Sequence, residues 1–183
     1  MATSGQMTTA DVQALLQDSA LAGDWTLDAS KTTIGLRSKS MWGLAPVKGV
    51  FREVTGQGTV SPAGEVSGTI SVAAATVDTK MKRRDAHLRS ADFFDTGNYS
   101  DITVTVDRLT PSSDGVTVAG RLTVRDRTQP VSFPATVSVF APDEVGLDAE
   151  IKVNRADFGL TWNQMGMASM ASTITVHAVF TKR

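Results

Sequence analysis

The residue types that could catalyse a reaction are concentrated in one short segment, "RRDAHLRSADFF" at residues 83–94. It contains His87, one of only two histidines in the chain, between Asp85 and Ser90. A histidine oriented by a carboxylate can act as a general base, and a nearby serine can act as a nucleophile. A catalytic triad is usually assembled from separate elements, however, whereas these three residues are close neighbours in the chain. The pattern therefore favours a charged connector whose side chains bond the backbone, and we predict no catalytic residue.

Binding of metals, nucleotides and nucleic acids has little support in the sequence. The chain has no cysteine, and His87 and His177 lie far apart without the spacing typical of a metal site. The basic residues between Lys80 and Arg89 are accompanied by acidic ones, and the formal net charge is -1. Such a segment is typical of a solvated face rather than of a nucleic-acid patch. We therefore predict no metal, no cofactor and no nucleic-acid partner.

Apolar and polar residues alternate through most of the chain after Trp25, as in half-buried antiparallel strands. The alternating runs begin at Ile34, Ile70, Ile102, Val116, Val131, Leu147 and Ile174. Together with "WTLD" and residues 47–60, they predict an all-β protein of about eight or nine strands. A two-sheet sandwich and a closed up-and-down barrel both fit this pattern. Small residues such as Gly120 and Ala178 on alternating faces would leave room inside a barrel.

The first part of the chain differs from the strand region. Residues 1–8, 9–22 and 23–183 are predicted to form, in that order, a disordered leader, a helix and one barrel domain. Thr9 can cap the helix and Gly23 can end it. The first thirty residues contain no Lys or Arg, and no apolar run is long enough to cross a membrane. We therefore expect a cytoplasmic protein without a signal peptide or an integral membrane segment.

Two longer segments interrupt the strands, one around residues 81–95, which is predicted to be a helical connector, and one around residues 154–173. The second carries several methionines, which can adapt to an apolar guest. Long loops in a compact domain often form lids or binding segments. Large apolar residues near these segments and in the strands are therefore candidate ligand contacts, although each can equally be core. They are Met41, Trp42, Phe51, Phe93, Phe94, Phe133, Phe158, Trp162, Met165 and Met167.

The segment "TVDTKMKRRDAHLRSADFFDTGNYSDITVTV" closely resembles the "RDxHLRSxDFFD" motif of the YceI-like family. Three further stretches resemble the family pattern at compatible spacing, namely "VKGVF" at 47–51, "VAGRLTVRDRTQPVSF" at 118–133 and "VNRADFGL" at 153–160. The resemblance runs from about Trp25 to the end of the chain. It implies a lipocalin-like antiparallel β-barrel of about eight strands whose apolar interior binds a long amphiphile, typically a polyisoprenoid such as an isoprenoid quinone.

The same resemblance implies that Arg84, Asp85, His87 and Arg89 are chiefly architectural. We therefore expect a protein that binds, carries or sequesters an isoprenoid-like lipid. Whether the protein forms a homodimer is left open. Two alternatives remain. The first is an enzyme, such as a cyclase or isomerase, that uses His87, Asp85 or Asn163 on a hydrophobic metabolite in the same cavity. The second is a fully packed barrel that acts only as an interaction module.

Overall fold

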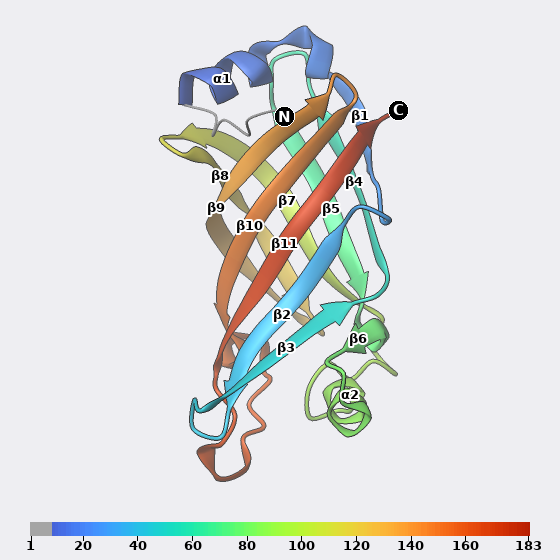
Figure 1. The fold of residues 1–183 in the computed structure, drawn as a ribbon, viewed down its shortest axis with the longest axis vertical. Coiled ribbons are helices and arrows are strands. Elements are labelled where there is room, and N and C mark those ends of the chain that lie inside the picture. Colours follow the sequence, from blue (N-terminus) through green and yellow to red (C-terminus); the bar gives the residue numbers. More distant parts are fainter. Residues whose placement is uncertain (1–8) are drawn as a thin grey trace.

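Strands make up most of the structure, a computed structural model that describes residues 9–183 (Figure 1). The strands are β1 (Gly23–Leu27), β2 (Thr33–Ser40), β3 (Ala45–Phe51), β4 (Val54–Val60), β5 (Val66–Ala73), β6 (Val77–Asp78), β7 (Asp101–Ser112), β8 (Gly115–Val124), β9 (Arg127–Ala141), β10 (Glu144–Asn154) and β11 (Ala171–Lys182). The α-helices are α1 (Thr9–Gln17) and α2 (Lys82–Arg89), and single 3₁₀ turns cover Ser19–Leu21, Ala74–Thr76, Arg155–Phe158 and Gln164–Gly166. The leader predicted for residues 1–8 lies outside the described residues.

Eight antiparallel strands close into a ring in the order β1-β4-β5-β7-β8-β9-β10-β11. The ring closes where β1 pairs with β11, with Trp25 opposite Lys182 and Leu27 opposite Phe180. Closure confirms the predicted all-β barrel of about eight strands and excludes the two-sheet sandwich. The short N-terminal helix and the helical connector within residues 81–95 are confirmed as α1 and α2.

Three strands branch from the ring at one end. The edge of β11 that pairs with β1 near its C-terminal end pairs with β2 earlier in the strand, with Thr173 opposite Arg37 and His177 opposite Thr33. β2 pairs with β3, β3 pairs with β6, and the sheet ends at β6. We call β2, β3 and β6 the flap. In Figure 1 the flap lies at the end of the barrel opposite α1, and α2 lies beside β6.

Alternation along β8 shows how the barrel wall is built. Val116, Val118 and Leu122 point inward and are fully buried, because successive side chains of a strand point to opposite faces. Gly120 lies in the same inward row. A Cβ atom there would come within 2.0 Å of the Thr105 carbonyl oxygen, so only glycine allows this approach to β7.

The helix α1 closes the other end of the barrel. Its buried residue Val12 packs on the inner surface made by Val116, Phe133 and their neighbours. The Trp25 indole Nε1 donates a hydrogen bond to the Leu21 carbonyl at 3.0 Å, which fixes the connection from α1 to β1. Within residues 9–183, no helix combines the length and the apolar composition that a membrane crossing requires.

Candidate functional site

The barrel encloses a cavity of about 280 Å³ at the end opposite α1. Inward-pointing residues of the ring and the flap form its wall, as the two-residue period of the strands requires. Leu36 of β2, Val104 of β7 and Ile174 of β11 are examples. α2 and residues 155–172 border its open end, which we call the mouth. Apolar groups make up most of the wall, so the interior suits a hydrocarbon better than a polar molecule.

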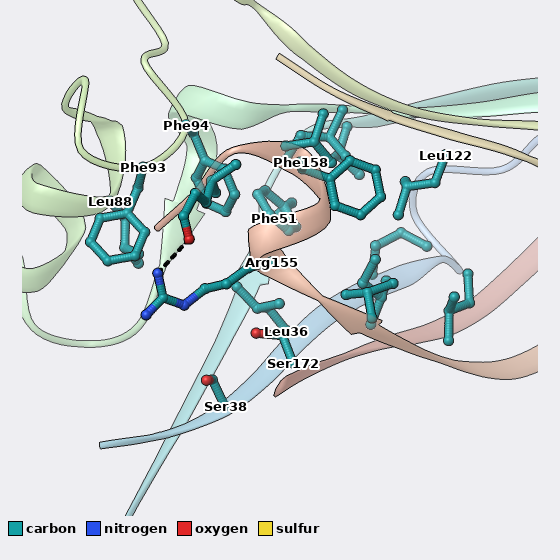
Figure 2. A pocket seen from close by; sticks show the side chains of 18 of the residues that line it. Leu36, Ser38, Phe51, Leu88, Phe93, Phe94, Leu122, Arg155, Phe158 and Ser172 are labelled. Atoms are coloured by element: carbon teal, nitrogen blue, oxygen red, sulfur yellow. Dashed lines mark hydrogen bonds between the residues drawn. The ribbon is translucent and has the colours of Figure 1, made fainter. Parts of the chain in front are cut away.

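Aromatic side chains gather at this cavity. Of the candidate ligand contacts, the lining includes Phe51, Phe93, Phe94, Phe133, Phe158 and Trp162. Figure 2 shows several of them from close by. The Phe51 and Phe94 rings lie 6.0 Å apart at an angle of 57°, a favourable tilted arrangement. Their buried positions fit either a core or a ligand wall, so their role as contacts stays a prediction.

A smaller aromatic cluster lies at the mouth and joins α2 to the long segment before β11. The His87 ring stands edge-on to Trp162 at 4.4 Å and to Phe93 at 5.1 Å between ring centroids. Phe93 and Trp162 are themselves 5.5 Å apart. The contacts hold residues from distant parts of the chain together over the mouth.

Arg155 is buried beside this cluster, with only 7% of its surface exposed. Its guanidinium donates hydrogen bonds to the carbonyls of Ser169 (2.9 Å), Leu160 (2.6 Å) and Ala168 (3.3 Å), and lies over the Phe93 ring. Figure 2 shows the side chain at the mouth, with one of these bonds dashed. Burial lowers the pKa of Arg155 from its usual value, because desolvation disfavours the charged form. The group forms no ion pair within the described part of the chain.

Polar side chains of the cavity are concentrated at the mouth. They are hydroxyl groups or basic groups, namely Ser38, Lys39, Ser40, Arg84, His87, Arg155, Ser169 and Ser172. Among the described residues that line the cavity, none is Asp or Glu. Donor groups at one end of an apolar cavity suit a ligand whose polar end accepts hydrogen bonds or carries negative charge.

The α2 residues of the charged connector bond mainly to the backbone and to Thr79. Buried Asp85 accepts hydrogen bonds from the Thr79 amide (2.9 Å) and hydroxyl (2.6 Å). Arg84 donates to the Thr79 hydroxyl at 2.7 Å, and Arg89 donates to the Ala75 carbonyl at 2.8 Å. This network connects α2 to β6. The sequence analysis did not name Thr79 as a site residue, because a single threonine in a polar segment has no pattern that marks it as structurally important.

The geometry around His87 does not bring a nucleophile to its ring. His87 Nε2 lies 2.9 Å from Asp92 Oδ2, while the Ser90 hydroxyl donates to the His87 carbonyl at 2.6 Å. Asn163 accepts a bond from the Ala168 amide at 2.9 Å and is not among the lining residues. Within residues 9–183, no group of three or more His, Asp or Glu side chains is arranged to hold a metal ion.

Four sequence candidates lie outside the cavity lining. Met41 and Trp42 are exposed in the turn between β2 and β3, and Met165 is exposed in the segment before β11. Met167 is half-buried beside them. The Trp42 amide donates to the Met167 carbonyl at 3.3 Å, so the two segments touch at the rim of the mouth.

A second cavity of about 140 Å³ lies beneath α1, and its lining is almost wholly apolar. Leu16 and Trp25 belong to this lining. Ile70, Val106 and Leu147 line both cavities, so we call these three residues the neck. The two apolar spaces therefore adjoin inside the barrel.

Comparison with known proteins identifies relatives of this barrel. Protein YceI of Escherichia coli is 29% identical over an alignment of 160 residues, and the match covers 82% of this chain and 83% of that protein. BcnA of Burkholderia cenocepacia superposes with a TM-score of 0.76 at 21% identity, covering 84% of this chain and 98% of BcnA.

A polyisoprenoid-binding domain from Saccharophagus degradans, implicated in plant cell wall breakdown, superposes with a TM-score of 0.70 at 17% identity. The match covers 87% of this chain and 98% of that domain. At this identity the two superpositions show a shared fold. The model of the YceI-like domain matches residues 25–181, which include every strand of the closed ring in whole or in part. The chain therefore belongs to the YceI-like domain family.

Proposed function

We propose that the protein binds a hydrophobic amphiphile with an isoprenoid-like chain inside the barrel, and carries or sequesters it. The observation that carries this proposal is the 280 Å³ apolar cavity with its polar groups confined to the mouth. The fold shared with the polyisoprenoid-binding domain of Saccharophagus degradans supports the same ligand class. Apolar burial contributes about 25 cal/mol per Å² to such binding.

The wall of the cavity favours one orientation of the ligand. The chain would lie against residues such as Leu36, Phe51 and Ile174, and the polar end would lie at the mouth. Because the charged groups that line the mouth are basic, we infer a head that accepts hydrogen bonds, such as a quinone carbonyl, a carboxylate or a phosphate.

The neck provides room for a longer chain. A 280 Å³ cavity lies just below the range of roughly 300–1,000 Å³ that is usual for small-molecule sites. The adjoining 140 Å³ space beneath α1 extends it without adding polar groups. We therefore infer that the distal end of a long ligand passes Ile70, Val106 and Leu147.

Native mass spectrometry of the freshly purified protein tests the proposal, followed by denaturing extraction and identification of any released molecule. We expect a stoichiometric long-chain amphiphile. Replacing Leu36, which lines the cavity, by Trp should abolish the bound mass, whereas Ser132→Trp, at an exposed outward-facing position of β9, should keep it. Protein without any adduct, and without a thermal shift on adding isoprenoid quinones or prenyl phosphates, would contradict the proposal.

A further inference from the structure

Four large apolar side chains project into solvent at the rim of the mouth. They are Met41, Trp42 and Leu44 in the β2–β3 turn and Met165 in the segment before β11, and their exposed fractions are 49%, 65%, 81% and 78%. We call these four residues the mouth tip. Single exposed apolar residues are common on proteins, but a group gathered on two adjoining loops marks an interaction site.

The backbone holds these side chains in an unusual conformation. Met41, Trp42 and Met165 have φ angles of 51°, 55° and 55°, in the left-handed region that bulky residues rarely adopt. Such strain persists where surrounding structure enforces it and is concentrated at functional sites. Here the Trp42 amide bonds the Met167 carbonyl, and the Ser169 amide bonds the Lys39 carbonyl at 2.9 Å.

Positive charge surrounds the mouth tip. Residues 37–48 contain three basic residues and no acidic one, and residues 158–176 contain no charged residue. The strand register places Lys152, Thr173, Arg37 and Lys48 in one row across β10, β11, β2 and β3. Arg37 pairs with Glu150 at 2.5 Å, so Lys39, Lys48 and Lys152 supply the unbalanced charge near the tip.

The opposite end of the molecule differs in charge. Val139 and Phe140 are exposed near the β9–β10 turn, where Asp143 and Glu144 follow in the chain and Glu144 pairs with Lys31, so no excess of positive charge surrounds them. Of these two groups of exposed apolar residues, only the mouth tip therefore has an excess of positive charge beside it.

We propose that the mouth tip docks on an anionic lipid bilayer. Trp42, Leu44 and Met165 enter the interfacial layer, where Trp is favoured, and the surrounding lysines face the lipid phosphates. Docking brings the mouth of the cavity to the membrane surface, where a hydrophobic ligand can move between bilayer and barrel without crossing water. A second copy of this chain fits the tip less well, because a symmetric contact would place Lys39 and Lys48 opposite their own copies.

Sedimentation of the protein with vesicles tests this inference. One set of vesicles contains phosphatidylglycerol and phosphatidylcholine in equal amounts, and the other contains phosphatidylcholine alone. We expect binding to the anionic vesicles. The double variant Trp42→Ser/Leu44→Ser should weaken it by about tenfold or more, because both apolar contacts are lost. Lys39→Gln/Lys48→Gln should weaken it by roughly tenfold or more on anionic vesicles.

Phe140→Ser is the matched control, since it removes an exposed aromatic residue at the end of the barrel opposite the mouth. It should leave vesicle binding unchanged. Quenching of tryptophan fluorescence by brominated lipid should occur in the wild type and fall in Trp42→Phe, which keeps an aromatic side chain at the tip.

Three results would overturn the inference. They are no binding to either vesicle, equal losses in Phe140→Ser and in the tip variant, or a dimer without vesicle binding that the tip variant disperses. Mass spectrometry of bound lipid separates this inference from the proposed function. The tip residues do not line the cavity, so a tip variant that no longer docks should still contain its ligand.

Discussion

Arg155 shows how much of the mouth depends on a single side chain. Its guanidinium holds three carbonyls of the segment that precedes β11 and is itself buried. We expect Arg155→Met to lower the free energy of unfolding by about 3 kcal/mol, because the carbonyls lose their donors. Thermal denaturation should then show a melting temperature roughly 6–12 °C lower.

The control for this prediction is Arg108→Met, which replaces an exposed arginine on β7. Its effect should stay within about 0.5 kcal/mol. Equal melting temperatures for Arg155→Met and the wild type would show that the hydrogen bonds of Arg155 do not hold the segment.

Asp78 of β6 provides a pH-dependent contact at the edge of the flap. Bonds from the Arg52 guanidinium, with Nε at 3.0 Å, and from the Lys80 amide lower the pKa of Asp78 from 3.8 to about 2. A lowered pKa stabilises the fold above pH 3.8, and this contribution is lost as the pH falls from 3.8 through about 2. In Arg52→Gln, the Asp78 pKa should rise toward 3.8, as NMR titration of the carboxyl carbon would show.

Arg121→Gln serves as the comparison for the Asp78 titration. It removes an exposed ion pair with Asp107 on the barrel wall, where the Arg121 Nη2 lies 2.8 Å from the carboxylate. The Asp78 titration should be unaffected in this variant. An unchanged Asp78 pKa in Arg52→Gln would assign the shift to the Lys80 amide instead.

At the scale of elements, the neck divides the barrel interior into two spaces. A Trp in place of Leu147 should block the passage between them and leave the larger space open. Wild-type protein should then bind isoprenoid alcohols more tightly as the chain lengthens, whereas Leu147→Trp should lose this gain for the longest chains. Fluorescence titration with alcohols of increasing length would measure the difference in dissociation constants.

Ser132→Trp places the same ring on the outer surface of β9, so it should retain the length dependence. Both variants must first give cooperative melting curves, because an added ring in a packed interior can cost about 1–3 kcal/mol. Identical length dependence in all three proteins would mean that the ligand does not pass the neck.

The elements were largely predictable because alternation is a local property. Ile34, Leu36 and Ser38 alternate in the sequence and line the cavity together, and Ile174 and Val176 do the same. The flap was not predicted, since the sharing of one β11 edge by β1 and β2 depends on pairing between distant residues. Likewise, the size of Trp42 suggested a cavity position, but a turn with positive φ directs it outward.

The structural role of Arg155 was only partly predictable from the sequence. It lies within "VNRADFGL", one of the motifs that resemble the family, yet nothing in that spacing shows which carbonyls it holds. Its partners Ser169 and Ala168 come from beyond the intervening loop. Hydrogen bonds to backbone carbonyls leave no residue-type signature, so a side chain of this kind is found only in the folded structure.

On the scale of the whole molecule, the two ends of the barrel are built differently. At the α1 end the ring is closed, and inner residues such as Val116 and Val118 are fully buried. At the mouth the sheet ends at β6, which pairs with β3 through only Asp78 and Val77. Thr79 and Asp85 connect this edge to α2. The mouth therefore has the weaker attachment, and it is the end through which a ligand would enter.

We expect this asymmetry to appear as motion of the flap. Amides of β3 should exchange hydrogen faster than those of β8, because β8 is paired along its length on both sides. Asp85→Ala should accelerate exchange in β3 further, since it removes the acceptor for Thr79. Hydrogen–deuterium exchange with mass spectrometry measures both effects, and added ligand should slow β3 and leave β8 unchanged. Equal rates in β3 and β8 would show that the barrel opens only as a unit and that ligand entry requires another route.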